Sequence, residues 1–374
     1  MLWAFRKFVF LVAAAFPLTA CGAPDETLRK LDAELEQTGE APSLLRTSTG
    51  PAIRIVGSST VAPFAETVAE QFGASSVFRT PIVETTGTGG GFKAFCSARG
   101  INHPSIVNAS RPIKASERRL CSENGIDDIV ELAIGFDGIA LVNAWGGPSF
   151  ELSKSDLYRA LAAELPTENG DWVPNPNRLW SDVITDLPSE RIRVSGPPPT
   201  SGTRDAFLEL VMEPGAAEIP ELAILKENDE AAFLRRARAL RNDGAWLDAG
   251  ENDAAIIQSL VKNEMALGVL GFSFLSQNSD RVRAARISGS SPTFETITRG
   301  DYEVSRSLYF YVRADDVKTV PGLGEFIRAF TSDAAIGPLG FLVERGLIPL
   351  PDEERSIVQA KAAEVTAGSN LSDR

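Results

Sequence analysis

Residues 53–64, Ile-Arg-Ile-Val-Gly-Ser-Ser-Thr-Val-Ala-Pro-Phe, decide how this chain can fold. The apolar and β-branched residues 53–56 predict a strand, and the turn residues 57–60 end it. A helix is expected next, because Pro63 fits the first helical turn, where its missing N–H costs nothing. Apolar residues recur at helical spacing as far as Phe72, so one face of this helix should pack against a sheet.

The strand end, the hydroxyl-rich turn and the helix N-terminus meet at one point. Free N–H groups, the positive end of the helix dipole and the turn's hydroxyls would together form a site for a small anion. Ser59 and Thr60 are also ordinary helix-capping residues. The turn by itself leaves both interpretations open.

The whole chain limits which functions are compatible with it. Its 374 residues are enough for two domains or lobes, and 43% hydrophobic with 23% charged residues is ordinary for a globular protein. The net charge is −13, and without the basic Arg6 and Lys7 it is −15. An acidic chain is poorly suited to nucleic acid, because sequence-independent binding depends on neutralising phosphates. We therefore expect no nucleic-acid partner, and an anion site that works through local donors.

The first 20 residues predict an export signal. Arg6 and Lys7 precede an apolar run, residues 8–16, that is too short to span a bilayer comfortably. Leu18-Thr19-Ala20-Cys21 then resembles a bacterial lipoprotein signal, in which Cys21 carries the lipid. A plain secretory signal cleaved after small residues is the alternative. Either interpretation exports the chain.

Export bears on the two remaining cysteines. Cys96 and Cys121 would be a pair in an oxidising compartment, so we expect a disulfide between them. Their spacing does not suggest a metal site, because neither has a second thiol or a histidine nearby. The polar residues 21–50 predict a tether, and the folded body is expected to start near Pro51.

Three further strand–turn–helix units follow. Strand 81–84 leads into Thr-Thr-Gly-Thr-Gly-Gly-Gly-Phe at 85–92 and a helix expected from Lys93. The glycines would let the backbone approach a ligand. This is neither a dinucleotide fingerprint nor a Walker loop, because Phe92 holds the third glycine position and no Gly-Lys-Ser/Thr follows. We therefore expect no nucleotide and no other cofactor.

The other two units lie further along the chain. Strand 105–107 ends at Asn-Ala-Ser-Arg-Pro-Ile, residues 108–113, before a helix with Ser116 as its expected cap. Strand 191–195 leads through residues 196–203, Gly-Pro-Pro-Pro-Thr-Ser-Gly-Thr, into an amphipathic helix. Helices are also expected at 155–165, 229–241, 254–263, 322–331 and 334–345, strands at 266–271 and 302–312, and an irregular surface segment at 171–188.

Alternating strands and helices predict an α/β fold with a mainly parallel sheet, in which ligands bind beyond the carboxyl ends of the strands. Several hydroxyl-bearing helix N-termini would converge there and supply the donors that a phosphate group needs. Arg111 and Arg204 add charge-assisted contacts that suit phosphate. Surface ion pairs are the alternative role for these two arginines.

Asp137 interrupts the apolar run 132–143, where an unpaired carboxylate would be costly. An ionised carboxylate only accepts hydrogen bonds, so it favours a ligand that keeps a proton, as monohydrogen phosphate does at neutral pH and sulfate does not. A helix cap or a core ion pair is the alternative role for Asp137.

Five motifs in order, residues 57–61, 87–92, 108–113, 134–139 and 201–205, carry a resemblance over residues 51–350. Together they resemble the phosphate-binding component of bacterial phosphate ABC importers. The resemblance implies a two-lobed class II periplasmic-binding-protein fold, each lobe a mixed, mainly parallel sheet flanked by helices, that closes over inorganic phosphate in the interlobe cleft. The ligand contacts that it implies are Ser59, Thr60, Val61, Thr88, Ser110, Ser201, Gly202 and Thr203.

One position departs from the family pattern. Some members have an aspartate after the Ala-Ser of the third motif, which accepts the phosphate proton, and this chain has Arg111 there. We assign the acceptor role to Asp137 instead, as an inference from its position.

The resemblance also sets the expected organisation. Lobe I would comprise residues 51–140 and 303–350, lobe II residues 141–302, and residues 351–374 a C-terminal extension, with hinges at 139–143 and 302–308. The expected partners are inorganic phosphate and the ABC permease with its ATPase. The chain would act as a monomer in the periplasm or cell envelope, attached to the membrane through its lipid alone.

Two other classes of function compete with this interpretation. A secreted phosphatase or other hydrolase is disfavoured, because His103 is the single histidine and there is no Gly-x-Ser-x-Gly elbow or cluster with metal-ligand spacing. We expect a protein that is not an enzyme and holds no metal. A binding protein for another oxyanion, such as sulfate or molybdate, or an envelope sensor or scaffold would share the same turn chemistry.

Overall fold

The computed structural model describes residues 50–167, 169–250 and 253–367. The predicted signal at 1–20, the lipid site at Cys21 and the tether up to residue 49 lie outside these described residues. Across the described ranges, no helix has both the length and the apolar character to cross a membrane.

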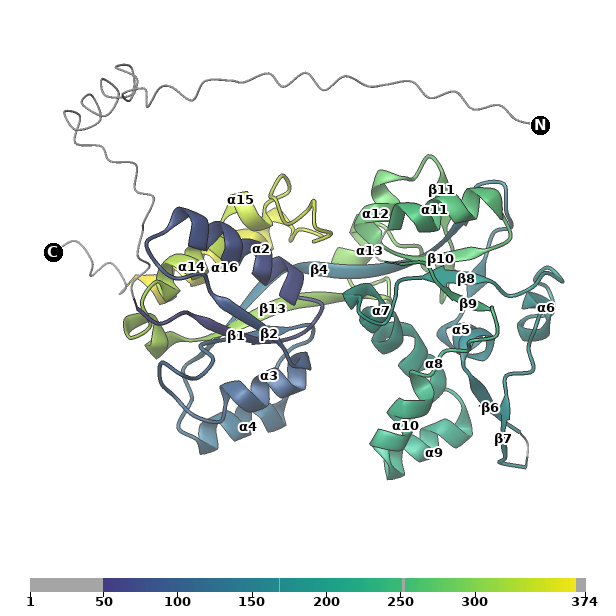
Figure 1. The fold of residues 1–374 in the computed structure, drawn as a ribbon, viewed down its shortest axis with the longest axis horizontal. Helices are drawn as coiled ribbons and strands as arrows, with labels where there is room; N and C mark the ends of the chain where they lie inside the picture. The colour runs from purple at the N-terminus through teal and green to yellow at the C-terminus, as the bar shows by residue number, and fades with distance from the viewer. Residues whose placement is uncertain (1–49, 168, 251–252, 368–374) are drawn as a thin grey trace, which may run out of the picture. The chain divides into compact units, whose positions relative to one another are not determined.

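A nine-stranded sheet organises the described chain, and its first half has the order β2-β1-β3-β13-β4. β1 pairs in parallel with β2 and β3, whereas β13 is antiparallel to β3 and β4. Helices cover both faces of this half (Figure 1). Its elements are β1 (Arg54–Gly57), α2 (Ala62–Ser75), β2 (Ile82–Thr85), α3 (Gly87–Phe95), β3 (Ile106–Ala109), α4 (Ala115–Glu123), β4 (Ile129–Ala144), β13 (Ser305–Arg313), η2 (Ala314–Lys318), α14 (Leu323–Phe330), α15 (Asp333–Ile336) and α16 (Asp352–Thr366).

The alternation of side chains along these strands separates two cores. Ile55 of β1 and Ile106 of β3 belong to the core that includes the buried face of α2. Their neighbours Val56 and Val107 belong to a second core with Phe92 of α3. Each strand is apolar on both faces because helices bury both.

The second half of the sheet has the order β4-β10-β8-β9, with β11 also paired to β4. β10 and β9 are parallel to β8, whereas β10 and β11 are antiparallel to β4. Its elements are β8 (Val194–Gly196), α7 (Gly202–Phe207), the π-helix η1 (Leu208–Met212), α8 (Glu213–Ala217), β9 (Trp246–Asp248), α11 (Asp253–Lys262), β10 (Leu267–Gly271), α12 (Phe272–Gln277), β11 (Val282–Ala284) and α13 (Phe294–Thr298).

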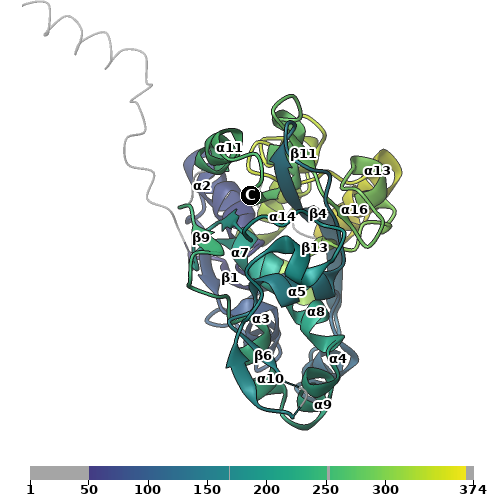
Figure 2. The same cartoon turned by 90° about the vertical axis from the view of Figure 1, so that its right-hand side faces the viewer.

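Smaller elements complete this half. They are β5 (Glu151–Leu152), α5 (Lys154–Leu161), β6 (Glu164–Pro166), β7 (Trp172–Pro174), α6 (Trp180–Val183), α9 (Pro220–Asn228), α10 (Glu230–Ala237) and β12 (Arg286–Ile287). β5 pairs with β12, and β6 pairs with β7. Arg236 of α10 lies over the ring of Trp172 at 3.7 Å and pairs with Glu164 at 2.8 Å, which joins β6 and β7 to the α9–α10 helices (Figure 2).

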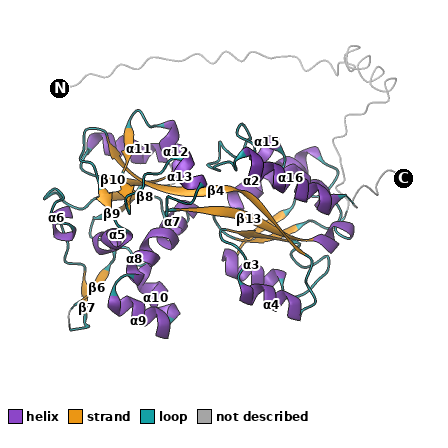
Figure 3. Ribbon diagram, turned by 180° about the vertical axis from the view of Figure 1, so that it is seen from behind, coloured by secondary structure: helices purple, strands orange, loops and turns teal. Residues whose placement is uncertain are grey.

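β4 is the strand shared by both halves, and Figure 3 shows it with β13 running between the two groups of helices. Residues 129–138 of β4 pair with β13, whereas residues 139–142 pair with β10. At this change of partner, Ile139 N donates to Val304 O at 2.9 Å, and the Tyr302 hydroxyl donates to Ile139 O at 2.8 Å.

The glycine-rich segment is helical, so the prediction of a helix that starts only at Lys93 is wrong. α3 begins at Gly87, where φ is +70°. A Cβ atom on Gly91 would lie 2.6 Å from Gly57 Cα. Glycine is therefore required because the helix packs directly on β1, in addition to any approach of a ligand.

The expected cap at Ser116 is also wrong, because α4 starts at Ala115, two residues before the start that this cap implies. Lys114 is the N-cap residue, and its backbone N–H donates to Glu117 Oε2 at 2.8 Å. The same carboxylate accepts from Arg111, so a single glutamate orders both the turn and the helix start.

The segment 171–188 is neither wholly irregular nor wholly on the surface. It contains β7 and α6, and the Trp180 ring is fully buried against Phe150, with centroids 5.3 Å apart. A tryptophan among prolines and asparagines gives no periodic signal, so the sequence pattern does not reveal this anchor.

Three predicted helices are shorter in the structure. α10, predicted over 229–241, ends at Ala237, before the β-bridge of Leu240 with Ala162. α5 ends at Leu161, before the paired strands β6 and β7. α15 ends at Ile336, because Gly337 precedes Pro338 and a residue before proline is driven out of helical geometry. The C-terminal residues 352–366 form helix α16, which the sequence analysis had treated only as an extension.

The structure joins Cys96 and Cys121 in a disulfide, as the sequence predicted. Both side chains are fully buried in the core that contains Phe92, and the bridge links the end of α3 to α4.

Replacing both cysteines by alanine should lower the free energy of unfolding by about 3 kcal/mol, because the bridge closes a loop of 25 residues in the unfolded chain. Urea unfolding of the exported wild type and of Cys96→Ala/Cys121→Ala measures this difference. Reductant should destabilise the wild type and leave the double variant unchanged. Two free thiols in the native protein by mass spectrometry would contradict the bridge.

Candidate functional site

A cavity of about 460 Å³ lies where the N-terminal ends of α2, α7 and α12 meet. The predicted residues Thr60, Asp137, Ser201, Gly202 and Thr203 line it. The other lining residues are Pro63, Phe64, Thr200, Asp253, Gly271, Ser273, Phe274, Gln277, Glu344, Arg345 and Gly346. The fold thus brings together turns that are far apart in the sequence.

Two turns are in direct contact at this cavity. A Cβ atom on Gly202 would lie 3.3 Å from Thr60 Cα, so glycine allows the second turn to approach the first closely. Ser59 Oγ donates to Asp205 Oδ2 at 2.8 Å, which connects the same two turns through side chains.

Capping does not explain the first turn. The N-cap residue of α2 is Val61, which has no side-chain cap, and the hydroxyls of Ser59 and Thr60 contact residues of other elements. In contrast, Ser201 is the N-cap of α7 and accepts from Thr203 N at 3.2 Å. The capping alternative therefore fails for the first turn, and Ser201 combines capping with a place in the cavity wall.

Arg306 of β13 is the centre of the charged groups beside the cavity. Its Nη2 donates to Thr60 Oγ1 at 2.6 Å, and its Nη1 pairs with Glu209. Its Nε lies 3.5 Å from Asp137 Oδ2 on the neighbouring strand, directly opposite in register. The side chain of Arg306 is only 9% exposed, so these contacts are largely shielded from water.

Asp137 is a carboxylate under opposing influences. Burial raises its pKa above the ordinary value, the charge of Arg306 acts in the opposite direction, and Glu209 adds to the increase. Among the described residues, Asp137 Oδ2 and Arg306 Nε are buried and make no hydrogen bond. The two atoms therefore face each other as an ion pair without a hydrogen bond, beside the cavity that Asp137 lines.

Glu209 reaches Arg306 from the π-helix η1. Pro214 lies in the helix just after this wide turn and has no N–H to donate to the turn before it. π-Turns of this kind are frequent at functional sites, and this one presents a carboxylate to the central arginine.

Thr88 and Ser110 lie outside the lining of this cavity. Their hydroxyls are 3.2 Å apart, and Ser110 N donates to Thr88 Oγ1 at 3.2 Å. They connect the start of α3 to the end of β3, as two neighbouring turns at the carboxyl ends of parallel strands should.

The two predicted arginines are engaged in ion pairs. Arg111 makes two bonds to Glu117, at 2.9 and 2.7 Å, which raise its pKa. Arg204 donates to Pro197 O at 3.0 Å and to Asp248 Oδ1 at 2.7 Å. Its guanidinium also lies over the Trp246 ring at 4.5 Å. Neither side chain lines the cavity.

Arg306 and Glu209 are site residues that the sequence pattern does not identify. The sequence does contain one indication of Arg306, because a cation in one predicted strand can pair with an aspartate in another predicted strand. That they face each other depends on strand order and register, which the sequence pattern leaves open. Glu209 gave no signal, since a glutamate on an amphipathic helix is ordinary.

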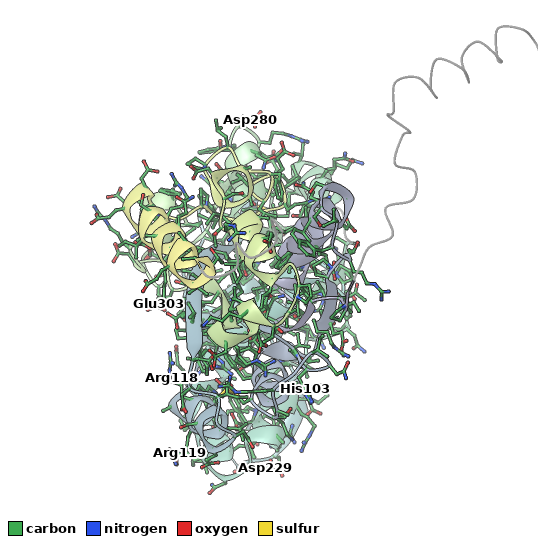
Figure 4. All side chains as sticks on the ribbon, turned by 90° about the vertical axis from the view of Figure 1, so that its left-hand side faces the viewer. His103, Arg118, Arg119, Asp229, Asp280 and Glu303 are labelled. Atoms are coloured by element: carbon green, nitrogen blue, oxygen red, sulfur yellow. A yellow bond between two sulfur atoms is a disulfide. The ribbon has the colours of Figure 1, made fainter. Side chains whose placement is uncertain are left out.

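No group of three or more potential metal ligands occurs in the described ranges. His103 lies in the loop before β3 and is partly exposed. Figure 4 places it in the lower half of that view, where Arg118 and Arg119 of α4 are also labelled. It is not among the residues that line the cavity.

Comparison with known proteins identifies the family. A family model described as the PBP superfamily domain matches residues 37–334. A Synechocystis protein named SphX is 29% identical over 313 residues, which cover 82% of this chain and 80% of that protein. A protein of Staphylococcus saprophyticus named phosphate-binding protein PstS is 28% identical over 323 residues, which cover 85% of this chain and 86% of that protein.

A solved structure agrees with this assignment. The crystal structure described as a possible phosphate binding protein from Planctomyces limnophilus is similar with a TM-score of 0.68 and 27% identity, over 85% of this chain and 99% of that chain. Its likeness confirms the α/β fold class predicted from the sequence. Because the family model covers well over half of the residues of the present chain, this chain belongs to the PBP superfamily.

Proposed function

We propose that this chain is an extracytoplasmic binding protein that captures inorganic phosphate at the cavity beside Asp137 and Arg306. The observation that carries the proposal is the shielded ion pair of Asp137 Oδ2 and Arg306 Nε, 3.5 Å apart, in which neither atom makes a hydrogen bond. Relatives named as phosphate-binding proteins support the choice of ligand. The chain is a substrate-binding protein and not an enzyme, as its family indicates.

Monohydrogen phosphate matches this pair, because it offers a proton to a carboxylate and anionic oxygens to a guanidinium. Asp137 would accept the phosphate proton, and Arg306 would turn toward the anion. Thr60, Ser201 and Thr203 line the same cavity and would donate hydroxyl hydrogen bonds. Sulfate has no proton at neutral pH and would face the Asp137 carboxylate without a hydrogen bond to it.

The proposed set of phosphate contacts keeps the residues predicted from the sequence and adds Arg306. Thr88, Ser110 and Arg111 belong to the same proposed lobe as Asp137 and would contact the ligand from the ends of neighbouring strands, and Arg204 would contribute its charge from behind α7. The proposed contacts are Ser59, Thr60, Val61, Thr88, Ser110, Arg111, Asp137, Ser201, Gly202, Thr203, Arg204 and Arg306.

We propose two lobes, residues 51–140 with 303–350 and residues 141–302, that hinge where β4 changes partner near Ile139. Phosphate would favour the closed form through contacts available only there. The closed monomer would then deliver phosphate to an ABC permease and its ATPase. A lipid on Cys21 after removal of the signal would hold the protein at the envelope membrane.

Calorimetric titration of the exported, phosphate-stripped chain should give tight one-to-one binding of phosphate that excess sulfate does not displace. The reason is the proton match at Asp137. Binding of sulfate or molybdate in preference to phosphate would favour an importer component for another oxyanion. Binding of none of these ions would overturn the proposed function.

Asp137→Asn should reduce the preference for phosphate over sulfate, because an amide can donate to a fully ionised anion. Competition titrations of both anions measure the ratio of the two dissociation constants. Glu209→Gln is the matched control, since it removes the other carboxylate at Arg306 and keeps Asp137. An unchanged ratio in Asp137→Asn would remove Asp137 from the acceptor role.

Arg306→Gln should weaken phosphate binding roughly 10- to 100-fold, the loss of one charge-assisted hydrogen bond of about 1.5–3 kcal/mol. Arg355→Gln is the matched control, because it removes a similarly shielded arginine of α16 that is bonded to Asp333 and Asp352 and is not a proposed contact. An equal loss of phosphate affinity in Arg355→Gln would contradict the role of Arg306.

A further inference from the structure

A second hollow, of about 330 Å³, lies at the amino ends of β8 and β9. Its charged lining comprises Arg178, Arg191, Arg193, Arg241 and Asp243. The arginines 191 and 193 precede β8, whereas the Ser-Gly-Thr turn of the phosphate cavity follows it. The two hollows thus lie at opposite ends of one strand.

Asp243 is the carboxylate of this lining, and it is already shared between two arginines. Arg241 is buried and donates to both oxygens of Asp243, at 2.9 and 2.5 Å, and to Asn177 O at 2.6 Å. Arg178 also pairs with Asp243. Hydrogen bonding from Arg241 is the main cause that lowers the pKa of Asp243 to about 2, so this carboxylate stays ionised.

Arg191 and Arg193 have no acidic partner within ion-pair distance in the part of the chain that the structure describes. Both are exposed, and the buried Ile192 between them places the two on the same side of an extended segment. The backbone of this segment is fixed, because Ile192 N donates to Arg178 O at 3.0 Å and Leu267 N donates to Arg193 O at 2.9 Å.

The nearby Asp182 makes its hydrogen bonds to the backbone and not to these arginines. Its carboxylate accepts from the N–H groups of Arg178 and Leu179, at 2.7 and 2.8 Å, and these two bonds lower its pKa, so it stays ionised. The four arginines and Asp243 of the lining sum to +3, and Asp182 reduces this to +2, on a chain whose net charge is −13. A hollow with net positive charge on an acidic protein is a candidate site for an anion.

The shape and chemistry of the hollow define the ligand class. Guanidinium groups suit phosphate because they can donate two parallel hydrogen bonds. A volume of about 330 Å³ falls at the lower end of the range of small-molecule sites, and it exceeds what a single tetrahedral ion needs. Leu247, which is 45% exposed, adds an apolar wall.

We propose that Arg178, Arg191 and Arg193 form a second anion site, separate from the phosphate cavity, that binds an anionic phosphate group. The group is that of a dissolved diphosphate-type compound or of a phospholipid headgroup. Because the site shares no residue with the phosphate cavity, it is independent of the proposed function.

Inorganic pyrophosphate titrated into the full exported chain probes the dissolved form. Vesicles of phosphatidylglycerol with phosphatidylcholine, compared with phosphatidylcholine alone, probe the headgroup, because a lipid anchor would insert into both. Arg191→Ala/Arg193→Ala should weaken binding of the recognised probe at least tenfold. Arg191→Lys/Arg193→Lys should weaken it less, because it keeps the charge and removes the paired donors.

Arg118→Ala/Arg119→Ala is the matched control, because it removes two exposed arginines from α4 and changes the net charge equally (Figure 4). This control should bind like the wild type, and thermal unfolding of each variant checks its fold. Pyrophosphate binding lost only on substitution of 191 and 193 supports a dissolved ligand, and excess vesicle binding lost in the same way supports a headgroup. Binding of neither probe, equal losses in the two alanine variants, or binding that survives Arg191→Ala/Arg193→Ala overturns the proposal.

Discussion

The cross-strand pair of Asp137 and Arg306 is the constraint on which the centre of this molecule depends. The two residues face each other where β4 leaves its pairing with β13 for that with β10. An unpaired carboxylate at this depth would be costly, and the arginine beside it offsets that cost through its charge. Because the same arginine bonds to Thr60 and Glu209, it connects the turn after β1 to the π-helix η1.

Much of the fold could be predicted from local patterns. β1 and α2 follow the apolar spacing and the proline at 63, and β3, β4 and β10 follow continuous apolar runs that two layers of helices bury. Of the site residues, the sequence indicates the hydroxyl-bearing turns and Asp137, an aspartate within an apolar run. They share a cavity because the turns follow strands of one sheet, where strand ends meet.

What the sequence did not reveal depends on partners that are distant along the chain. The sequence shows the charges of Arg111 and Arg204, but not that Glu117 and Asp248 engage their guanidinium groups. Arg306 gained its place only through the register of β13 with β4. The glycines of α3 suggested approach to a ligand, whereas Gly91 is required for contact with β1. In each case the sequence gives the type of residue, but it does not give the residue that it contacts in the fold.

The position of β13 has a consequence for the order of assembly. This strand lies between β3 and β4 in the sheet, although it comes from residues 305–313. β3 and β4 therefore have no bridge between them until most of the polypeptide has been synthesised. Long-range pairings of this kind slow folding and leave strand edges open to wrong partners. A chain with this topology completes the first half of its sheet last, whereas the Cys96–Cys121 loop can close early.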